Sequence, residues 1–529
     1  MKKITILLAL ALLVAVTLPA VAEVEEVTVG GSIVVRGQIQ TPGVGQQRGP
    51  VNVGGFTNGH LVDANGNGVI EASDLTFSLA NFNNFVESSS FDDDIESLDW
   101  ITQRTRVNVD AKLSGNVRAF VELQSFDFWG DDSDDDSLED GNASDVSPFT
   151  TEQMFITTEG DDLVQLYQGY IEMNNIADLP LQARIGRQEL PYGREWLLGN
   201  NDAGVNFSGL AFDALKLSYE TDLFRIDAFA SKLDDDTTPL AIPNQEEDGD
   251  ADLYGVYGTY KGIENMAIDA YWLFVRDAGS LVTITGADAD TEDVLDLHTV
   301  GARIAGQWDV MGLLPGMLDY NVEAAFQFGN NNVADSGGDG GDFGGWAFNA
   351  MAGYTFSDVT WTPRLEAEYA FFSGDDDFND GDTDEFVRLF SDVHYGELNL
   401  GGDLDQLATN MHIIKLGASA VPVEKLTLKG DFYWFLLAED DEDGLAKTFG
   451  LPQLERTGAV VAGQPVEVIG SDDNVGMELD LVANYQYTED LNLRAGWAHF
   501  FADDAIENSW GAGSDDDIDY VYVQAALVF

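Results

Sequence analysis

A run of oxygen-bearing residues between positions 63 and 74 has the spacing of a calcium-binding loop. Asp63, Asn65 and Asn67 occupy the first, third and fifth places of a twelve-residue stretch. Gly68 supplies the sharp turn that such a loop requires, and Asp74 closes it. We therefore expect one bound Ca²⁺, and the alternative is a solvated Asn- and Gly-rich turn. The candidate metal ligands are Asp63, Asn65, Asn67, Val69, Glu71 and Asp74.

A second set of chemically active residues consists of basic side chains that alternate with apolar ones. Arg104 and Arg106 share one face of an extended segment, whereas Val107 and Val109 share the other. If the polar faces line a lumen, their cations could attract an anionic solute. The alternative is a structural lattice of Arg–carboxylate pairs. The candidate pore-lining cations are Arg104, Arg106, Arg118, Arg184, Arg187, Lys216, Arg225, Arg303, Arg364 and Arg494.

Composition excludes several other kinds of chemistry. The chain has 529 residues with 94 Asp+Glu, 25 Lys+Arg and a formal net charge of -69, so we expect no nucleic-acid partner. The absence of Cys rules out disulfides and zinc-thiolate sites. We find no G-x-S-x-G, P-loop or H-E-x-x-H motif, and we expect no enzyme.

The elements that must position these side chains are extended segments of about 10 to 15 residues with period-two alternation. Short turns and long acidic loops join them in turn, which is the pattern of a transmembrane β-barrel. We therefore predict an all-β fold: a single antiparallel barrel of about 18 strands with long acidic extracellular loops. The expected strands lie near 27–40, 100–113, 117–127, 162–175, 181–190, 210–220, 223–233, 252–262, 266–277, 297–309, 318–329, 345–357, 360–373, 411–422, 426–438, 475–487, 491–501 and 518–529.

The two ends of the chain support export to an outer membrane. Lys2 and Lys3, an apolar run and an A-x-A site before Glu23 predict a signal peptide over residues 1–22. Residues 518–529 alternate up to a terminal Phe529, as in the closing strand of an outer-membrane barrel. We expect residues 23–529 to form the barrel, with a long first extracellular loop at 44–98 that carries the calcium loop.

One stretch resembles a known family of outer-membrane proteins. Residues 181–193 read LQARIGRQELPYG, which resembles the G-R-Q-x-L-x-x-G strand of the bacterial alginate export family. The likeness continues into Phe212-Asp213-Ala214, although the family has Gly where this chain has Ala214. Residues 370–377, AFFSGDDD, resemble its strand end in S-G-D. The resemblance covers most of residues 100–529 and implies an 18-stranded barrel.

The calcium loop is similar in spacing to an EF-hand. Asp74 in place of the usual Glu resembles the dockerin version, but one copy is present where dockerins use two. This argues against a dockerin-like partner role. Our hypothesis is that calcium orders the loop over the mouth of the barrel.

These observations lead to one predicted function and one alternative. We expect a monomeric channel in a Gram-negative outer membrane, of the alginate export or porin type. It would pass a hydrophilic saccharide or other small solute, anionic ones included, by passive diffusion. We expect contacts with outer-membrane lipid or lipopolysaccharide, and with the barrel assembly machinery through the C-terminal strand. The alternative is a calcium-organised, adhesive surface protein anchored by a closed barrel.

Overall fold

The fold is that of a computed structural model of the whole chain. The structure describes residues 24–41, 56–57, 60–61, 98–113, 116–129, 164–202, 207–234, 251–277, 294–311, 315–334, 340–376, 382–398, 409–439, 473–503 and 517–529. The expected signal peptide and the calcium loop at 63–74 lie outside these residues. Among the described residues, no helix is long and apolar enough to cross a bilayer.

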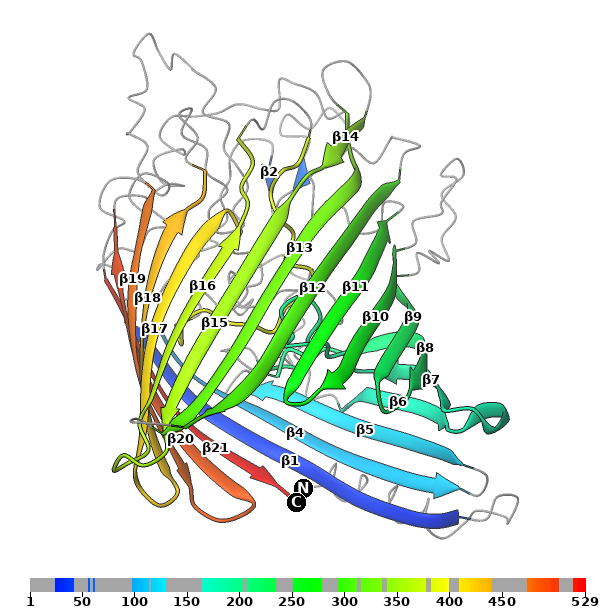
Figure 1. Ribbon diagram of the computed structural model, residues 1–529, viewed down its shortest axis with the longest axis horizontal. Coiled ribbons are helices and arrows are strands. Elements are labelled where there is room, and N and C mark those ends of the chain that lie inside the picture. Colours follow the sequence, from blue (N-terminus) through cyan, green and yellow to red (C-terminus); the bar gives the residue numbers. More distant parts are fainter. Residues whose placement is uncertain are drawn as a thin grey trace.

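The described residues form one closed antiparallel barrel of 18 strands, as the alternation predicts. The barrel strands are β1 (Val24–Thr41), β4 (Leu98–Leu113), β5 (Val117–Phe128), β6 (Gln165–Met173), β7 (Leu181–Gln188), β8 (Phe212–Glu220), β9 (Phe224–Asp234), β10 (Ala251–Ile263), β11 (Met266–Asp277), β12 (Leu295–Val310), β13 (Gly316–Ala334), β15 (Trp346–Phe356), β16 (Arg364–Phe372), β17 (Met411–Val423), β18 (Leu426–Leu437), β19 (Asn474–Gln486), β20 (Leu491–Ala502) and β21 (Ile518–Val528). Figure 1 shows these strands side by side and tilted.

Four minor elements accompany the barrel strands in the described residues. Strand β14 (Gly340–Phe343) pairs with the end of β13, and β2 (Phe56–Thr57) pairs with β3 (His60–Leu61). One 3-10 turn, η2 (Ile176–Asp178), joins β6 to β7.

Each barrel strand pairs with the next one in the chain, and the last closes on the first. β21 pairs with β20 and with β1, which also pairs with β4. At the seam, the N–H of Gly31 donates to the carbonyl of Phe529 at 2.9 Å, and the N–H of Phe529 donates back at 3.0 Å. Closure leaves no strand edge unpaired, which is the condition for a sheet to cross a bilayer.

Short turns lie at one end of the barrel, which is the periplasmic end in barrels of this class. The turns between β10 and β11 and between β17 and β18 place Asn265 and Lys425 at positive φ, 57° and 72°. Both are two-residue connections, the length that favours a tight β-hairpin.

The outward face of the barrel is apolar. Alternate side chains such as Ile226, Ile304 and Leu365 are exposed, at 44%, 42% and 54%. A continuous band of this kind would be costly in water but suits the hydrocarbon of a membrane. The inward face carries the charged and polar side chains, most of which are buried.

Candidate functional site

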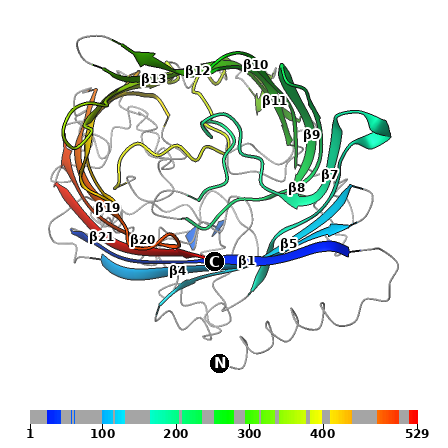
Figure 2. The same cartoon turned by 60° about the horizontal axis from the view of Figure 1, so that its bottom comes forward.

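The lumen is crossed by two segments that leave the barrel wall and fold inward. The first inward segment comprises residues 189–202 and 207–211, after β7. The second comprises residues 373–376 and 382–398, after β16. Figure 2 shows both within the ring of strands. The sequence predicts every long loop outside the barrel, and these two segments differ from that prediction.

The two inward segments are bonded to each other inside the lumen. Leu198 and Phe390 form a parallel β-bridge, and the N–H of Phe390 donates to the carbonyl of Leu197 at 2.9 Å. The indole N–H of Trp196 donates to the hydroxyl of Tyr395 at 3.3 Å. These side chains are almost fully buried in an apolar cluster, so the segments narrow the lumen as one packed unit.

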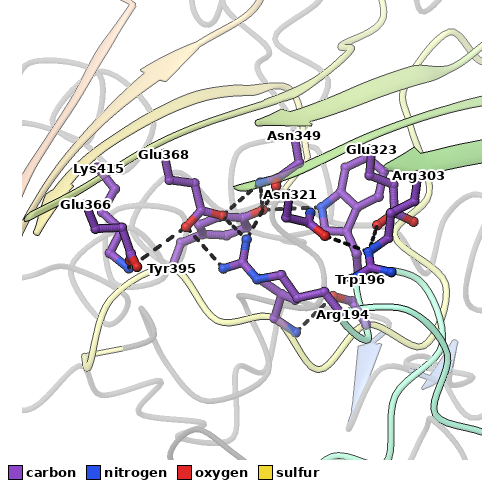
Figure 3. Close-up of polar contacts among 12 residues, drawn as sticks. Arg194, Trp196, Arg303, Asn321, Glu323, Asn349, Glu366, Glu368, Tyr395 and Lys415 are labelled. Atoms are coloured by element: carbon purple, nitrogen blue, oxygen red, sulfur yellow. Dashed lines mark hydrogen bonds and ion pairs between the residues drawn. The ribbon is translucent and has the colours of Figure 1, made fainter. Parts of the chain in front are cut away.

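An ion pair fixes the first inward segment to the far wall. Arg194 donates to both carboxylate oxygens of Glu368 on β16, at 2.5 and 3.1 Å. The amide of Asn349 on β15 also donates to Glu368, at 2.8 Å. Figure 3 shows this arrangement between the segment and the strands. The Glu368 side chain is 2% exposed, and a bidentate pair of this kind both orients the Arg and neutralises a buried charge.

The near wall holds the same segment through the first two predicted pore cations. Arg104 and Arg106 on β4 are buried, and both bind the carboxylate of Asp202, with Nη1–O distances of 2.7 and 3.1 Å. The guanidinium of Arg104 also lies 5.5 Å from the ring centre of Phe207. These two cations are therefore matched by a carboxylate of the inward segment.

Aromatic stacking adds a third attachment. The ring of Tyr192 stacks on Tyr257 at 4.6 Å and on Phe229 at 5.6 Å, and its hydroxyl donates to Asp227 at 3.0 Å. Stacked pairs of this kind add to the free energy of burial. The first inward segment thus contacts β4, β9, β10, β15 and β16.

Acidic groups of the two segments lie close together where the segments meet. The N–H of Asp202 donates to the Asp392 carboxylate at 3.1 Å. Burial, together with the negative charge of Asp392, raises the pKa of Glu195 above its usual range. The junction therefore favours protonated carboxyl groups more than open water would.

A row of basic groups lies nearer the periplasmic end, on the wall formed by β5 to β8. Register places Arg118 beside Glu172, Glu172 beside Arg184, and Arg184 beside Lys216. The Glu172 carboxylate accepts from Arg184 at 2.8 Å and lies 3.8 Å from Arg118. Arg118 also pairs with Asp110. Lys216 is buried, and no described carboxylate lies within ion-pair distance of it.

Four further predicted cations face the lumen in ion pairs. They are Arg225 with Asp227 (2.9 Å), Arg303 with Asp269 (2.6 Å), Arg364 with Asp319 and Glu366, and Arg494 with Glu397 (2.5 Å). Most of the predicted cations thus belong to the lattice of Arg–carboxylate pairs that the sequence analysis held as the alternative. That these cations contact a permeating solute remains a prediction.

The prediction that Arg187 lines the pore is wrong. Register pairs Arg187 with Asp213, on the face of β7 that also carries the exposed Ile185. Its guanidinium lies 3.5 Å from the Asp213 carboxylate, and that carboxylate is itself exposed. Arg184 and Arg187 are an odd number of residues apart, so strict alternation puts them on opposite faces.

The G-R-Q stretch has a structural role in β7. Gly186 adopts φ 122°, and a Cβ there would lie 2.3 Å from the carbonyl oxygen of Gly169. Gln188 is fully buried, and its amide donates to the carbonyls of Gly186 and Ala214 at 3.0 and 2.9 Å. These contacts hold β7 between its neighbours just before the chain turns into the lumen.

Several residues of the lumen were not singled out from the sequence. Arg194, Asp202 and Arg388 belong to segments that were interpreted as external loops. One signal distinguishes the first inward segment from an acidic external loop: residues 189–211 contain Leu190, Trp196, Leu197, Leu198 and Phe207, all of them buried. No described group of three or more His, Asp or Glu side chains could hold a metal ion.

A closed 18-stranded barrel with an apolar outer band and a charged, partly filled lumen defines the class: an outer-membrane channel protein. The alginate export family model matches residues 89–518, and the chain belongs to this family. Family and fold are those of outer-membrane channels, and the chain is not an enzyme.

Solved structures with the same fold have very different sequences. OccAB2 of Acinetobacter baumannii is 10% identical with a TM-score of 0.51, and 95% of this chain and 98% of that chain are covered. OpdL of Pseudomonas aeruginosa is 8% identical with a TM-score of 0.50 and the same coverage. These likenesses concern the fold alone. No curated protein matches the chain in sequence.

Proposed function

We propose that this barrel conducts small hydrophilic anions, anionic saccharides among them, down their concentration gradient across the outer membrane. The row of Arg118, Arg184 and Lys216 carries the proposal, because it sets three cations against the two carboxylates of Glu172 and Asp110. Lys216 is the member with no described carboxylate within ion-pair distance, and it is 6% exposed, so it attracts a passing solute through its electric field and not by direct contact. A low-dielectric wall strengthens that attraction.

The position of the row supports the same proposal. Elsewhere in the described lumen, basic side chains such as Arg303 and Arg494 are matched by nearby carboxylates. The row also lies on the periplasmic side of the inward segments: Glu172 is five residues closer to the periplasmic turn of β6 than Tyr167, whose hydroxyl donates to Glu189 of the first segment at 2.6 Å. A solute that has passed the narrowing would next meet this row of cations, in which Lys216 has no described carboxylate within ion-pair distance.

Reversal potentials in planar bilayers test this function. Under a salt gradient, we expect the native protein to pass chloride in preference to potassium. Lys216→Gln should reduce that preference, and Lys216→Glu should reduce it further. Lys425→Gln, in the exposed turn between β17 and β18, is the matched control and should leave it unchanged. Cation preference in the native protein, or no effect of either Lys216 variant, would contradict the proposal.

A second candidate is a closed barrel that anchors calcium-organised surface loops. One observation favours it: the cluster of Trp196, Leu198, Phe386 and Phe390 is buried across the lumen, as in a plug. A plugged barrel would show no conductance steps in the same bilayer experiment. A deletion that removes the first inward segment would then be needed to open it.

A further inference from the structure

Two carboxyl groups on β19 hold the second inward segment against the wall. Oε1 of Glu478 accepts the backbone N–H of Leu398 at 2.8 Å, and Oδ2 of Asp480 accepts the N–H of Glu397 at 3.1 Å. Glu478 and Asp480 are two positions apart, so they lie on the same face of the strand. Consecutive amides of the segment are therefore bound by consecutive inward side chains of the wall.

At this contact, the backbone of the second inward segment lies very close to the Glu478 carboxyl group. Gly396 has φ 105°, and a Cβ there would lie 2.4 Å from Oε2 of Glu478. Glu478 is 0% exposed and Asp480 is 2% exposed. Water cannot surround these carboxyl groups while the segment is in place, so their charge is not offset by solvent.

The charges that face the pair do not neutralise it. No described Lys, Arg or His lies within ion-pair distance of Glu478 or Asp480. Arg494 on β20 is bound by Glu397, which also accepts from Tyr522 on β21 at 2.5 Å. The titratable and charged groups around the pair are Asp431, Tyr433 and Lys429 of β18, Lys415 of β17, Arg494 of β20, Tyr522 of β21 and Glu397 of the segment. Lys415 and Lys429 both interact with Asp431.

The pair itself needs a proton. The two carboxyl groups lie within hydrogen-bonding reach of each other. Oε2 of Glu478 and Oδ1 of Asp480 have no donor in the surrounding described structure. Because a carboxylate can only accept, the two groups can bond only if one of them is protonated. Two unneutralised carboxylates buried together would be strongly disfavoured, and such pairs titrate as a unit.

We propose that Glu478 and Asp480 share one proton and form a pH-sensitive latch that holds the second inward segment in the lumen. Loss of that proton leaves two buried negative charges beside Glu397 and Asp431. Each carboxylate accepts its amide N–H more strongly once it is ionised, but the repulsion between the two groups and their demand for water outweigh this gain and release the segment. The lumen is therefore narrower at acidic pH and wider at alkaline pH. This inference concerns the segment and requires no particular solute.

Single-channel conductance of the full chain at mildly acidic and mildly alkaline pH is the first test. We expect a severalfold rise with pH in the native protein. Glu478→Gln keeps the acceptor for Leu398 and donates permanently to Asp480, so its conductance should stay low at both pH values. Asp480→Asn should behave in the same way. Asp319→Asn, whose carboxylate pairs with Arg364 away from the segment, should keep the native response.

Thiol labelling gives a second readout that does not depend on conduction. The chain has no Cys, so Leu398→Cys introduces a single thiol at a buried position of the segment. Its labelling rate, divided by that of Asp358→Cys in an exposed turn, should rise severalfold with pH. In the Glu478→Gln background the ratio should stay constant.

The latch is overturned if the labelling ratio of Leu398→Cys does not change with pH, or if Glu478→Gln and Asp480→Asn keep the full pH response. A protein that labels as expected but shows no anion preference would leave the latch intact and contradict the proposed function instead. The two proposals can therefore fail separately.

Discussion

Arg194 and Glu368 show how single residues determine the width of this lumen. Their ion pair joins the first inward segment to β16 across the barrel, and the Glu368 side chain is almost fully shielded from water. Removal of one member of a buried pair leaves an uncompensated charge, which is far more costly than the loss of an exposed pair.

We therefore predict that Arg194→Met destabilises the barrel by about 3 kcal/mol. Its single-channel conductance should also rise, because the first inward segment loses its attachment to the far wall. Denaturant unfolding in detergent, followed by the shift of the folded band on unheated gels, measures the first effect. Lys112→Met, which breaks the exposed pair with Glu26, is the control and should show no measurable change. Equal effects of the two variants would contradict this role of Arg194.

Alternation in the sequence predicts the direction of most lumen side chains but not their partners. Arg104 and Arg106 face inward as the pattern requires, yet Asp202, which binds both, is distant in sequence and belongs to no strand. Arg187 lies three positions after Arg184, so alternation places it on the opposite face of β7, beside Asp213. Partnership between distant residues depends on how the loops fold, which period-two patterning does not encode.

At the scale of elements, the sequence predicts all 18 barrel strands, with boundaries within five residues; the largest difference is at the end of β13, Ala334. Side-chain period, strand length and short turns all act locally, so a single sequence carries them. The inward segments were missed because packing against the lumen wall, a nonlocal property, sets their path. An unusual share of apolar and aromatic residues in 189–211 is the one local sign of it.

The seam of the barrel gives a prediction about strand packing. A Cβ at Gly31 of β1 would lie 2.4 Å from the backbone oxygen of Arg106 and 2.8 Å from the ring of Phe529. Gly31→Ala should therefore disturb the join between β1, β4 and the C-terminus, and lower the amount of folded barrel in the outer membrane. Gly37→Ala, on the same strand with its nearest contact at 3.8 Å, is the matched control. Equal yields of folded protein would show that the seam tolerates a methyl group.

The oxygen-bearing stretch at 63–74 gives a prediction about calcium. Residues 63–74 lie outside the described structure, so the site stays a prediction from spacing. Calorimetry of the whole protein should detect calcium binding at millimolar concentration, and Asp63→Ala should abolish it. Asp134→Ala, a change in a different acidic run, should leave binding intact. An absence of calcium heat in the native protein would remove the site.

For the whole molecule, a net charge of -69 gives little guidance to what passes through it. Acid-rich runs such as 131–136 lie outside the described residues, and their extracellular placement remains a prediction. Within the described lumen, most charges are paired across strands, and Lys216 is an exception on the basic side. We therefore expect ion selectivity to depend on a few unmatched charged groups near the narrowing, and not on the net charge of the chain.

Single-channel recording of the purified full chain in planar bilayers tests the central claim most directly. The claim is that the inward segments narrow the lumen without sealing it. We predict discrete, reproducible conductance steps with a preference for anions. An absence of steps from protein that is shown to be folded would contradict the claim and favour a sealed barrel that anchors surface loops.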